Sequence, residues 1–170
     1  MTGPASPARV TRKRERTRGE LVAAAEHLVA ARGLDAVSID DITEAADVAK
    51  GTFYTHFADK NDLAAAIALR GRMELEEKIT ALNKGIRDAG ERMANGLSTT
   101  FAFAISNPVR ARALLRLQPS VVDPDEQMNA GLRSDTALGL KTKRFTAISL
   151  NAAVVTLIGG ALSTVLRLSD

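Results

Sequence analysis

Apolar side chains recur at helical spacing along most of the chain. Over residues 12–32 they return every three or four positions, with Leu21, Ala25 and Leu28 on one face, as in a helix that covers a core. Gly33 follows this pattern at the position where a glycine commonly closes a helix. No stretch alternates between apolar and polar residues with a period of two. The pattern therefore predicts an all-α fold.

Two short helical patterns follow the first helix. Ser38 can cap the first of them, which reaches Ala46 before Asp47 interrupts it; the second covers about residues 49–57. Two short helices joined by a tight turn need small residues where the backbones meet, and a turn residue that tolerates the left-handed conformation. Ala46 and Asp47 meet these needs, so we predict a helix-turn-helix over residues 38–57.

Five further helices are predicted in the remainder of the chain. Asp59 can cap the first of these, and Pro108, Pro119 and Pro124 separate later ones. We expect helices at about residues 61–84, 88–106, 109–118, 125–138 and 146–168.

The outer side of the second short helix is rich in hydrogen-bond donors. Phe53 and Phe57 are four residues apart and can face the core together. The side chains that remain outside can donate to phosphates and base edges. These outer residues are Lys50, Thr52, Tyr54, Thr55 and His56.

Positive charge is concentrated near the N-terminus. The net charge is only +3, but residues 9–18 contain six basic residues against the single acid Glu15. A basic segment beside a compact module is typical of phosphate binding. A solvated, disordered leader explains the same residues equally well, so contact of this segment with DNA stays open.

The stretch from Glu20 to Leu63 resembles the DNA-binding domain of the TetR family of regulators. The matching residues are Arg32-Gly33-Leu34, Ser38 to Ile42, Ala45-Ala46, Val48, Lys50 to Tyr54, His56-Phe57, Lys60 and Leu63. The resemblance implies an all-helical homodimer whose third helix lies in the major groove of double-stranded DNA. It also implies that the rest of the chain binds a small molecule that releases the DNA.

Two positions depart from the family pattern. Asp47 stands where the family usually has glycine, and it can adopt a positive φ at some cost. Ala49 stands where the family often has a serine cap, whose loss costs about 1 kcal/mol of local stability. Neither departure alters the predicted fold.

The resemblance assigns DNA contacts residue by residue. The positions concerned are Ser38, Lys50, Gly51, Thr52, Tyr54, Thr55, His56 and Lys60. Ser38, His56 and Lys60 would bind phosphate, and Gly51 would let the helix backbone approach the groove. A half-buried packing role for Tyr54 and a solvated surface position for Lys60 are the alternatives.

The predicted domain organisation has three parts. Residues 1–17 form a flexible basic arm, residues 18–60 the DNA-binding domain, and residues 61–170 a helical domain for ligand binding and dimerisation. Within residues 61–170, an apolar row on the fifth helix and two leucines beyond it could form the wall of an effector pocket between helices. Ordinary core packing explains the same pattern. The residues are Met93, Leu97, Phe101, Ile105, Leu114 and Leu117.

The final helix carries an apolar seam at alternating four- and three-residue spacing, as in a helix packed on a partner helix. The seam, which we predict to be the dimer interface, is formed by Ile148, Ala152, Val155, Gly159, Leu162 and Leu166. The uncharged stretch from Phe145 to Leu166 is also long enough to span a bilayer. In the family two C-terminal helices build the dimer bundle, so either the helix at 125–138 is the second partner or the chain is truncated or atypical.

Catalytic and metal-binding patterns are not found in the sequence. There is no cysteine and there are two histidines, His27 and His56, too few for the common zinc sites. No glycine-rich phosphate loop follows a strand pattern. We therefore expect that the protein is not an enzyme and that it binds neither a metal nor a cofactor. The predicted function is a cytoplasmic repressor released from a palindromic operator by an apolar or amphipathic effector. The alternative is a helical ligand-binding or membrane-anchored protein in which DNA binding is secondary.

Overall fold

The computed structural model describes residues 7–117, 123, 125, 129–147 and 149–169, and all regular secondary structure within them is helical. The helices are α1 (Pro7–Arg32), α2 (Ile39–Ala45), α3 (Lys50–Tyr54), α4 (Lys60–Leu82), α5 (Ala89–Ser106), α6 (Pro108–Leu117), α7 (Ala130–Lys141) and α8 (Leu150–Ser169). The predicted all-α fold is thus confirmed.

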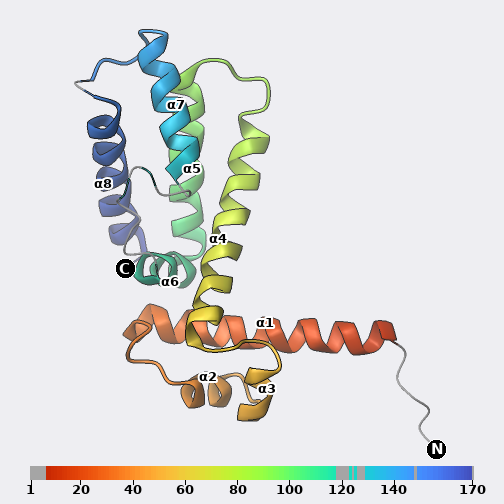
Figure 1. Cartoon of the computed structure of the whole chain (residues 1–170). Coiled ribbons are helices and arrows are strands. Elements are labelled where there is room, and N and C mark those ends of the chain that lie inside the picture. The colour runs from red at the N-terminus through yellow and green to blue at the C-terminus, as the bar shows by residue number, and fades with distance from the viewer. Residues whose placement is uncertain (1–6, 118–122, 124, 126–128, 148, 170) are drawn as a thin grey trace, which may run out of the picture.

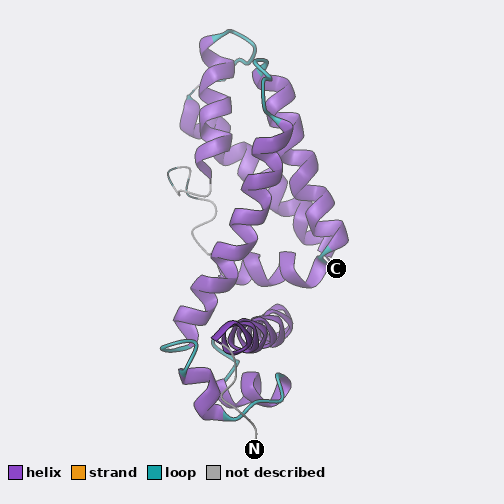
Figure 2. Ribbon diagram, turned by 90° about the vertical axis from the view of Figure 1, so that its right-hand side faces the viewer, coloured by secondary structure: helices purple, strands orange, loops and turns teal. Residues whose placement is uncertain are grey.

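The helices form two tiers joined by α4 (Figures 1 and 2). The lower tier consists of α1, with α2 and α3 beneath it. The upper tier is a bundle of α5, α7, α8 and the upper part of α4, and α6 lies crosswise at its base, directly over α1. Because α4 begins in the lower tier and ends in the upper one, the two share a rigid element.

The first helix begins earlier than the sequence pattern predicted. It starts at Pro7 instead of near Arg12, so most of the segment predicted as a flexible arm is helical and extends sideways beyond α3 (Figure 1). Proline is favoured at the first helical position, and arginine, lysine and glutamate are good helix formers. An i,i+4 ion pair between Arg16 and Glu20 (3.3 Å) adds local support.

One apolar cluster holds the lower tier together. It joins α1, α2, α3 and the start of α4, and its largest enclosed members are Phe53, Phe57, Leu21, Ile42, Leu63 and Ile67. The prediction that Phe53 and Phe57 face the core is confirmed, since their exposed fractions are 0% and 2%. Each large side chain buried in this way contributes roughly 1.5–3 kcal/mol.

The two tiers meet where α6 packs on α1 and α4. Arg110 of α6 lies between two acids, with its Nε 3.4 Å from Glu26 of α1 and its Nη1 2.9 Å from Glu74 of α4. Nearby, Gly71 of α4 lies so close to Leu114 of α6 that an added Cβ would be 2.5 Å from the leucine Cδ1. Charge and close packing therefore join the tiers at the same place.

The later helices are displaced from their predicted bounds. The seventh begins at Ala130 instead of near 125, and the eighth begins at Leu150 instead of near 146. After α7 the chain reverses because Lys143 adopts a left-handed conformation (φ 56), while the amides of Arg144 and Phe145 both donate to the Gly139 carbonyl. The Phe145 ring then lies against Gly139, where no side chain would fit. This tertiary contact moves the start of α8 beyond the point where the apolar pattern begins.

Asp47 provides a test of the backbone at the tight turn between α2 and α3, where its φ is 53. A left-handed conformation costs a residue with a Cβ about 1–2 kcal/mol. We expect Asp47→Gly to raise the free energy of unfolding by about 0.5–1 kcal/mol, and Asp47→Val, which is β-branched, to lower it by about 1–2 kcal/mol. Urea denaturation of the three proteins measures both changes. A glycine variant less stable than the wild type would contradict the assignment of strain to this residue.

Candidate nucleic-acid interface and ligand cavity

The geometry of α2 and α3 is that of a helix-turn-helix. Ser38 and Asp41 form a reciprocal capping box at the start of α2, with the Asp41 amide 3.0 Å from the serine Oγ. After the turn at Asp47, Val48 packs on the apolar cluster of the lower tier. Ala49 occupies the N-cap of α3 and makes no side-chain hydrogen bond there. This is expected, because alanine stands where a capping serine is common.

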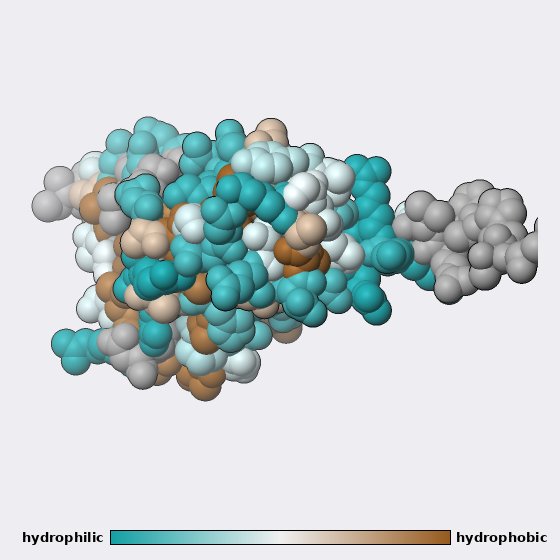
Figure 3. Space-filling model, turned by 90° about the horizontal axis from the view of Figure 1, so that it is seen from below, coloured by the Kyte–Doolittle hydropathy of each residue, from teal (hydrophilic) through white to brown (hydrophobic). Residues whose placement is uncertain are grey.

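The outer face of α3 is largely exposed. Tyr54 is 54% exposed although the adjacent Phe53 is fully buried, and the two rings meet edge to face. Lys50 and Thr55 are also exposed, and nothing lies within 4 Å of a Cβ built on Gly51. No packing within the described chain therefore explains this glycine, and another molecule could approach its backbone. Seen from below, hydrophilic side chains cover much of the lower tier (Figure 3).

Lys50 is held in place by an exposed ion pair. Its Nζ lies 2.8 Å from the nearer carboxylate oxygen of Asp40 in α2. The hydrogen bond that Lys50 donates to Asp40, and then the charge of Asp40, raise the pKa of Lys50. An exposed pair of this kind contributes little stability, so it can be exchanged for a phosphate or base contact.

Two arginines of the basic segment at residues 9–18 lie at the C-terminal end of α3, a position that the sequence did not predict. Arg14 of α1 donates to the Thr55 carbonyl (3.2 Å), and the Arg18 guanidinium lies 4.8 Å from the centre of the Phe57 ring. Partial burial, followed by the charges of Arg14 and Arg18, lowers the pKa of His56. The i,i+4 spacing of the two arginines was the available signal. Only the crossing of α1 and α3 brings them to His56.

Two residues predicted to bind phosphate already have partners inside the chain. The Ser38 hydroxyl donates to Asp41 in the capping box. The Lys60 Nζ donates to the carbonyls of Leu34 (3.0 Å) and Val37 (2.6 Å). Lys60 therefore ties the start of α4 to the loop before α2, a structural role that the sequence did not predict.

A partly open cavity of about 1220 Å³ lies between α4, α5, α6, α7 and α8 of the upper tier. Three of the six predicted effector residues line it, namely Met93, Leu97 and Leu114. Leu117 instead packs toward α1, beside Val29.

The other two predicted effector residues, Phe101 and Ile105, do not line the cavity. Phe101 packs against the cluster around Phe103, whose members line the cavity although Phe101 does not, and Ile105 is 62% exposed. An i,i+4 row turns by about 40° at each step. Twelve residues after Met93 it has therefore left the inner side of α5.

The cavity contains a charged pair that the sequence did not reveal. The Arg92 Nε of α5 lies 2.6 Å from Asp135 Oδ1 of α7, and both residues line the cavity. The Asp135 side chain is only 9% exposed. The two residues are 43 positions apart, so no local pattern could have paired them.

The seam predicted on the last helix is divided between two faces. Ala152, Val155, Gly159 and Leu166 are exposed, and we call them the outer face of α8. Leu162 lies at the edge of this stripe and lines the cavity, and Ile148 lies outside the described residues. The inner side of α8 is formed by other residues, which are Val154, Ile158 and Val165.

The stretch Leu150–Leu168 is long and apolar enough to cross a membrane by length and composition. This is weak support for an anchor, because core helices pass the same test, and α8 packs against α5, α6 and α7. Within the part of the chain that the structure describes, no group of three or more acids and histidines could hold a metal ion.

Residues 21–67 match the family of bacterial regulatory proteins named tetR. Among solved structures, the chain is similar to a gamma-butyrolactone receptor described as an ArpA-like protein, with 26% identity, a TM-score of 0.70, and 89% of this chain and 83% of that chain covered. RolR in complex with resorcinol is 28% identical, with a TM-score of 0.54 and coverage of 92% and 80%.

A tetR-family regulatory protein from Rhodococcus RHA1 shares the fold at 20% identity, with a TM-score of 0.70 and coverage of 88% and 83%. The family match falls on the helix-turn-helix and its supporting helices, and the structural matches extend through the upper tier. Residues 21–67 therefore match the TetR family of bacterial regulatory proteins, and the rest of the chain shares its fold with solved structures of such regulators.

Proposed function

We propose that this protein is a cytoplasmic transcriptional repressor that binds a palindromic operator as a homodimer and leaves it when a small molecule fills the cavity. The observation that carries the proposal is the outer face of α3. It exposes Lys50, Tyr54 and the backbone at Gly51 on a helix that Phe53 anchors to the core. Short rigid helices with exposed donors are suited to reading base edges in the major groove.

The cavity supports a role for a small molecule. Its volume of about 1220 Å³ exceeds the usual range of ligand sites, about 300–1,000 Å³. Two structures similar to this chain are named for small ligands, a gamma-butyrolactone receptor and RolR with resorcinol. We propose that this chain likewise takes a small effector in its upper tier.

The junction between the tiers supports release of DNA by that effector. Leu114 lines the cavity and also packs against the apolar cluster of the lower tier. On the same helix, Arg110 pairs with Glu26 of α1. A molecule that displaces α6 would thus also move α1, against which α3 is packed, and the two binding events would be coupled reciprocally.

The outer face of α8 supports dimerisation. Val155 and Leu166 are 44% and 50% exposed, and Gly159 leaves space for a close helix. A two-fold dimer would place two recognition helices one turn of B-DNA apart, about 34 Å, or a multiple of it.

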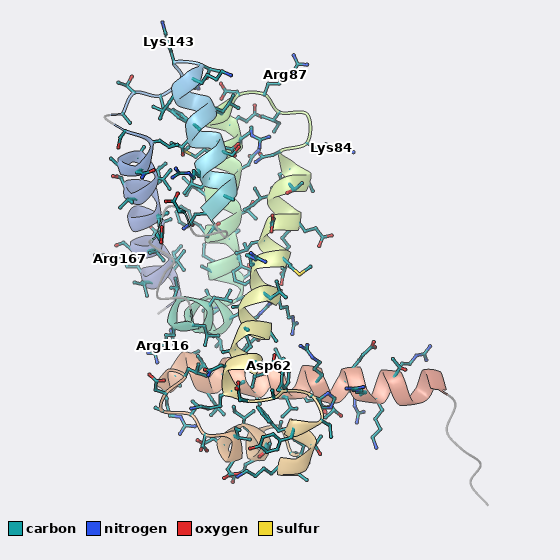
Figure 4. The ribbon with its side chains drawn as sticks, viewed as in Figure 1. Asp62, Lys84, Arg87, Arg116, Lys143 and Arg167 are labelled. Carbon is teal, nitrogen blue, oxygen red and sulfur yellow. The ribbon has the colours of Figure 1, made fainter. Side chains whose placement is uncertain are left out.

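The DNA-reading role can be tested with Lys50→Ala and Tyr54→Ala. An operator would first be selected from a pool of duplexes with a randomised centre. Each variant should bind that operator about ten- to a hundredfold more weakly, at about 1–3 kcal/mol per lost base contact, with a smaller loss on scrambled DNA. Arg87→Ala is the matched control, because Arg87 is exposed at the end of the upper tier remote from α3 (Figure 4) and does not line the cavity. Equal losses on operator and scrambled DNA would contradict base reading by these residues.

The lowered pKa of His56 predicts a pH dependence with two opposite signs. The free folded protein disfavours the charged imidazole, so its stability should fall as the pH drops below the ordinary histidine pKa of about 6.5. A phosphate contact favours the charged form instead, so DNA affinity should rise between pH 7.5 and 6, by at most about tenfold per pH unit for each site. Fluorescence anisotropy at several pH values measures the affinity. If His56→Gln retains the full pH dependence, another group is responsible.

Dimerisation through α8 can be tested with Val155→Lys. A charge on the outer face of α8 should give a folded monomer that binds the selected operator far more weakly, although α3 is unchanged. Sedimentation velocity and circular dichroism measure assembly and folding. Ile105→Lys is the control, because Ile105 is 62% exposed on a different helix. A Val155→Lys protein that stays dimeric would place the interface elsewhere.

A further inference from the structure

We propose that the cavity takes an uncharged amphipathic molecule, with a head group that carries both a hydroxyl and a carbonyl at Arg92 and Asp135, and a hydrocarbon tail directed toward α6. The proposal rests on the function proposed above and adds the chemical class of the ligand.

The cavity has a polar end and an apolar end. Lys84 marks the end of α4 remote from the lower tier (Figure 4), and Asn83 and Arg92, on either side of the α4–α5 loop, line the cavity near that end. Toward α6 most of the lining is apolar, with Phe103 and Leu115 among its residues, although Arg72, next to Gly71 in α4, also lines the cavity there. An elongated ligand with one polar end would match this gradient.

The polar end offers a donor and an acceptor together. Arg92 uses its Nε to contact Asp135 Oδ1, and within the described chain no acceptor is hydrogen-bonded to its two terminal nitrogens. The second carboxylate oxygen of Asp135 accepts no hydrogen bond from the described residues, so it is open to a ligand donor. Asn83 contributes less, because its amide already donates to the Arg92 carbonyl and accepts from Asn95. A carbonyl can therefore accept from Arg92 while a hydroxyl donates to Asp135, and hydrogen bonds to charged groups are the stronger kind.

The charge balance selects an uncharged head group. The Asp135 side chain is 9% exposed and Arg92 already neutralises it. A carboxylate beside this pair would bring a second anion next to Asp135, and an ammonium a second cation next to Arg92, in a site where unpaired charge is costly. The other charged lining residues also balance, being Arg72 and Lys84 against Glu76 and Glu77.

The tail reaches the helix that contacts the lower tier. Leu114 and Leu115 of α6 line the apolar end, and Leu114 has no spare room on its other side, where it meets Gly71. The tail, more than the head group, is thus placed to displace α6.

Three probes with the same ten-carbon chain test the head group. They are monodecanoyl glycerol, decanoate and decyltrimethylammonium, titrated below micelle-forming concentrations into the full chain by isothermal calorimetry. The wild type should bind the glycerol ester at least tenfold more tightly than either ion. Asp135→Asn keeps an oxygen acceptor for Arg92 but leaves its charge unbalanced, so this variant should bind decanoate at least tenfold more tightly than the wild type does.

Asp125→Asn is the matched control. It removes a carboxylate that pairs with Arg133 (3.2 Å), and neither residue lines the cavity. The control should leave the probe ranking unchanged, and thermal melts establish that both variants fold. A ranking that changes equally in the control would overturn the proposal.

The probe ranking and the DNA selection can fail separately. A wild type that selects a palindrome but binds decanoate as tightly as the ester, or binds none of the probes, overturns the ligand class and leaves the DNA-binding role standing. A wild type that prefers the ester but selects no DNA supports the ligand class and contradicts the proposed function.

Discussion

Burial of Phe53 and Phe57 is the interaction on which the DNA-facing unit depends. Phe53 lies in α3 and Phe57 follows shortly after its end. The helix has five residues and no side-chain N-cap, and a helix so short does not persist alone. Both rings are enclosed by residues of α1, α2 and α4, with Leu21 and Leu63 in the same cluster. The orientation of Tyr54, the next residue after Phe53, is therefore set by the core of the whole lower tier.

The shared helix α4 and the crosswise helix α6 connect that core to the cavity. Leu114 belongs to the packing of both tiers, and Arg110 carries a charge between Glu26 and Glu74. The hydrogen bond from Lys78, and then Arg110, hold the pKa of Glu74 below its ordinary value. On the side away from the cavity, where Leu114 meets Gly71, the junction is closely packed and therefore stiff. A displacement at α6 therefore has few ways to be absorbed locally.

The ion pairs Lys50–Asp40 and Arg92–Asp135 differ in their exposure to solvent, and therefore in the role that each can have. Lys50 and Asp40 are both more than half exposed, so water screens their attraction and a phosphate can replace the carboxylate. Arg92 and Asp135 lie on the wall of a cavity, with the acid almost enclosed. There the pair fixes a donor and an acceptor in space, and separating it is expensive.

Local patterns were sufficient to predict the succession of helices, although not where α1, α7 and α8 begin, and the exposed side of α3. Capping at Ser38, the turn at Asp47 and the spacing of Phe53 and Phe57 act over a few residues, so the sequence alone predicted an all-α chain with a helix-turn-helix. Tertiary structure decided what depends on helices far apart in sequence. It placed Arg14 and Arg18 beside His56 and paired Arg92 with Asp135. It directed the Lys60 ammonium to carbonyls of the loop before α2, to which it donates hydrogen bonds. It also turned Ile105 outward and divided the α8 seam into an outer face and a cavity wall. A helical period identifies a face of a helix, but the crossing of neighbouring helices decides what that face contacts.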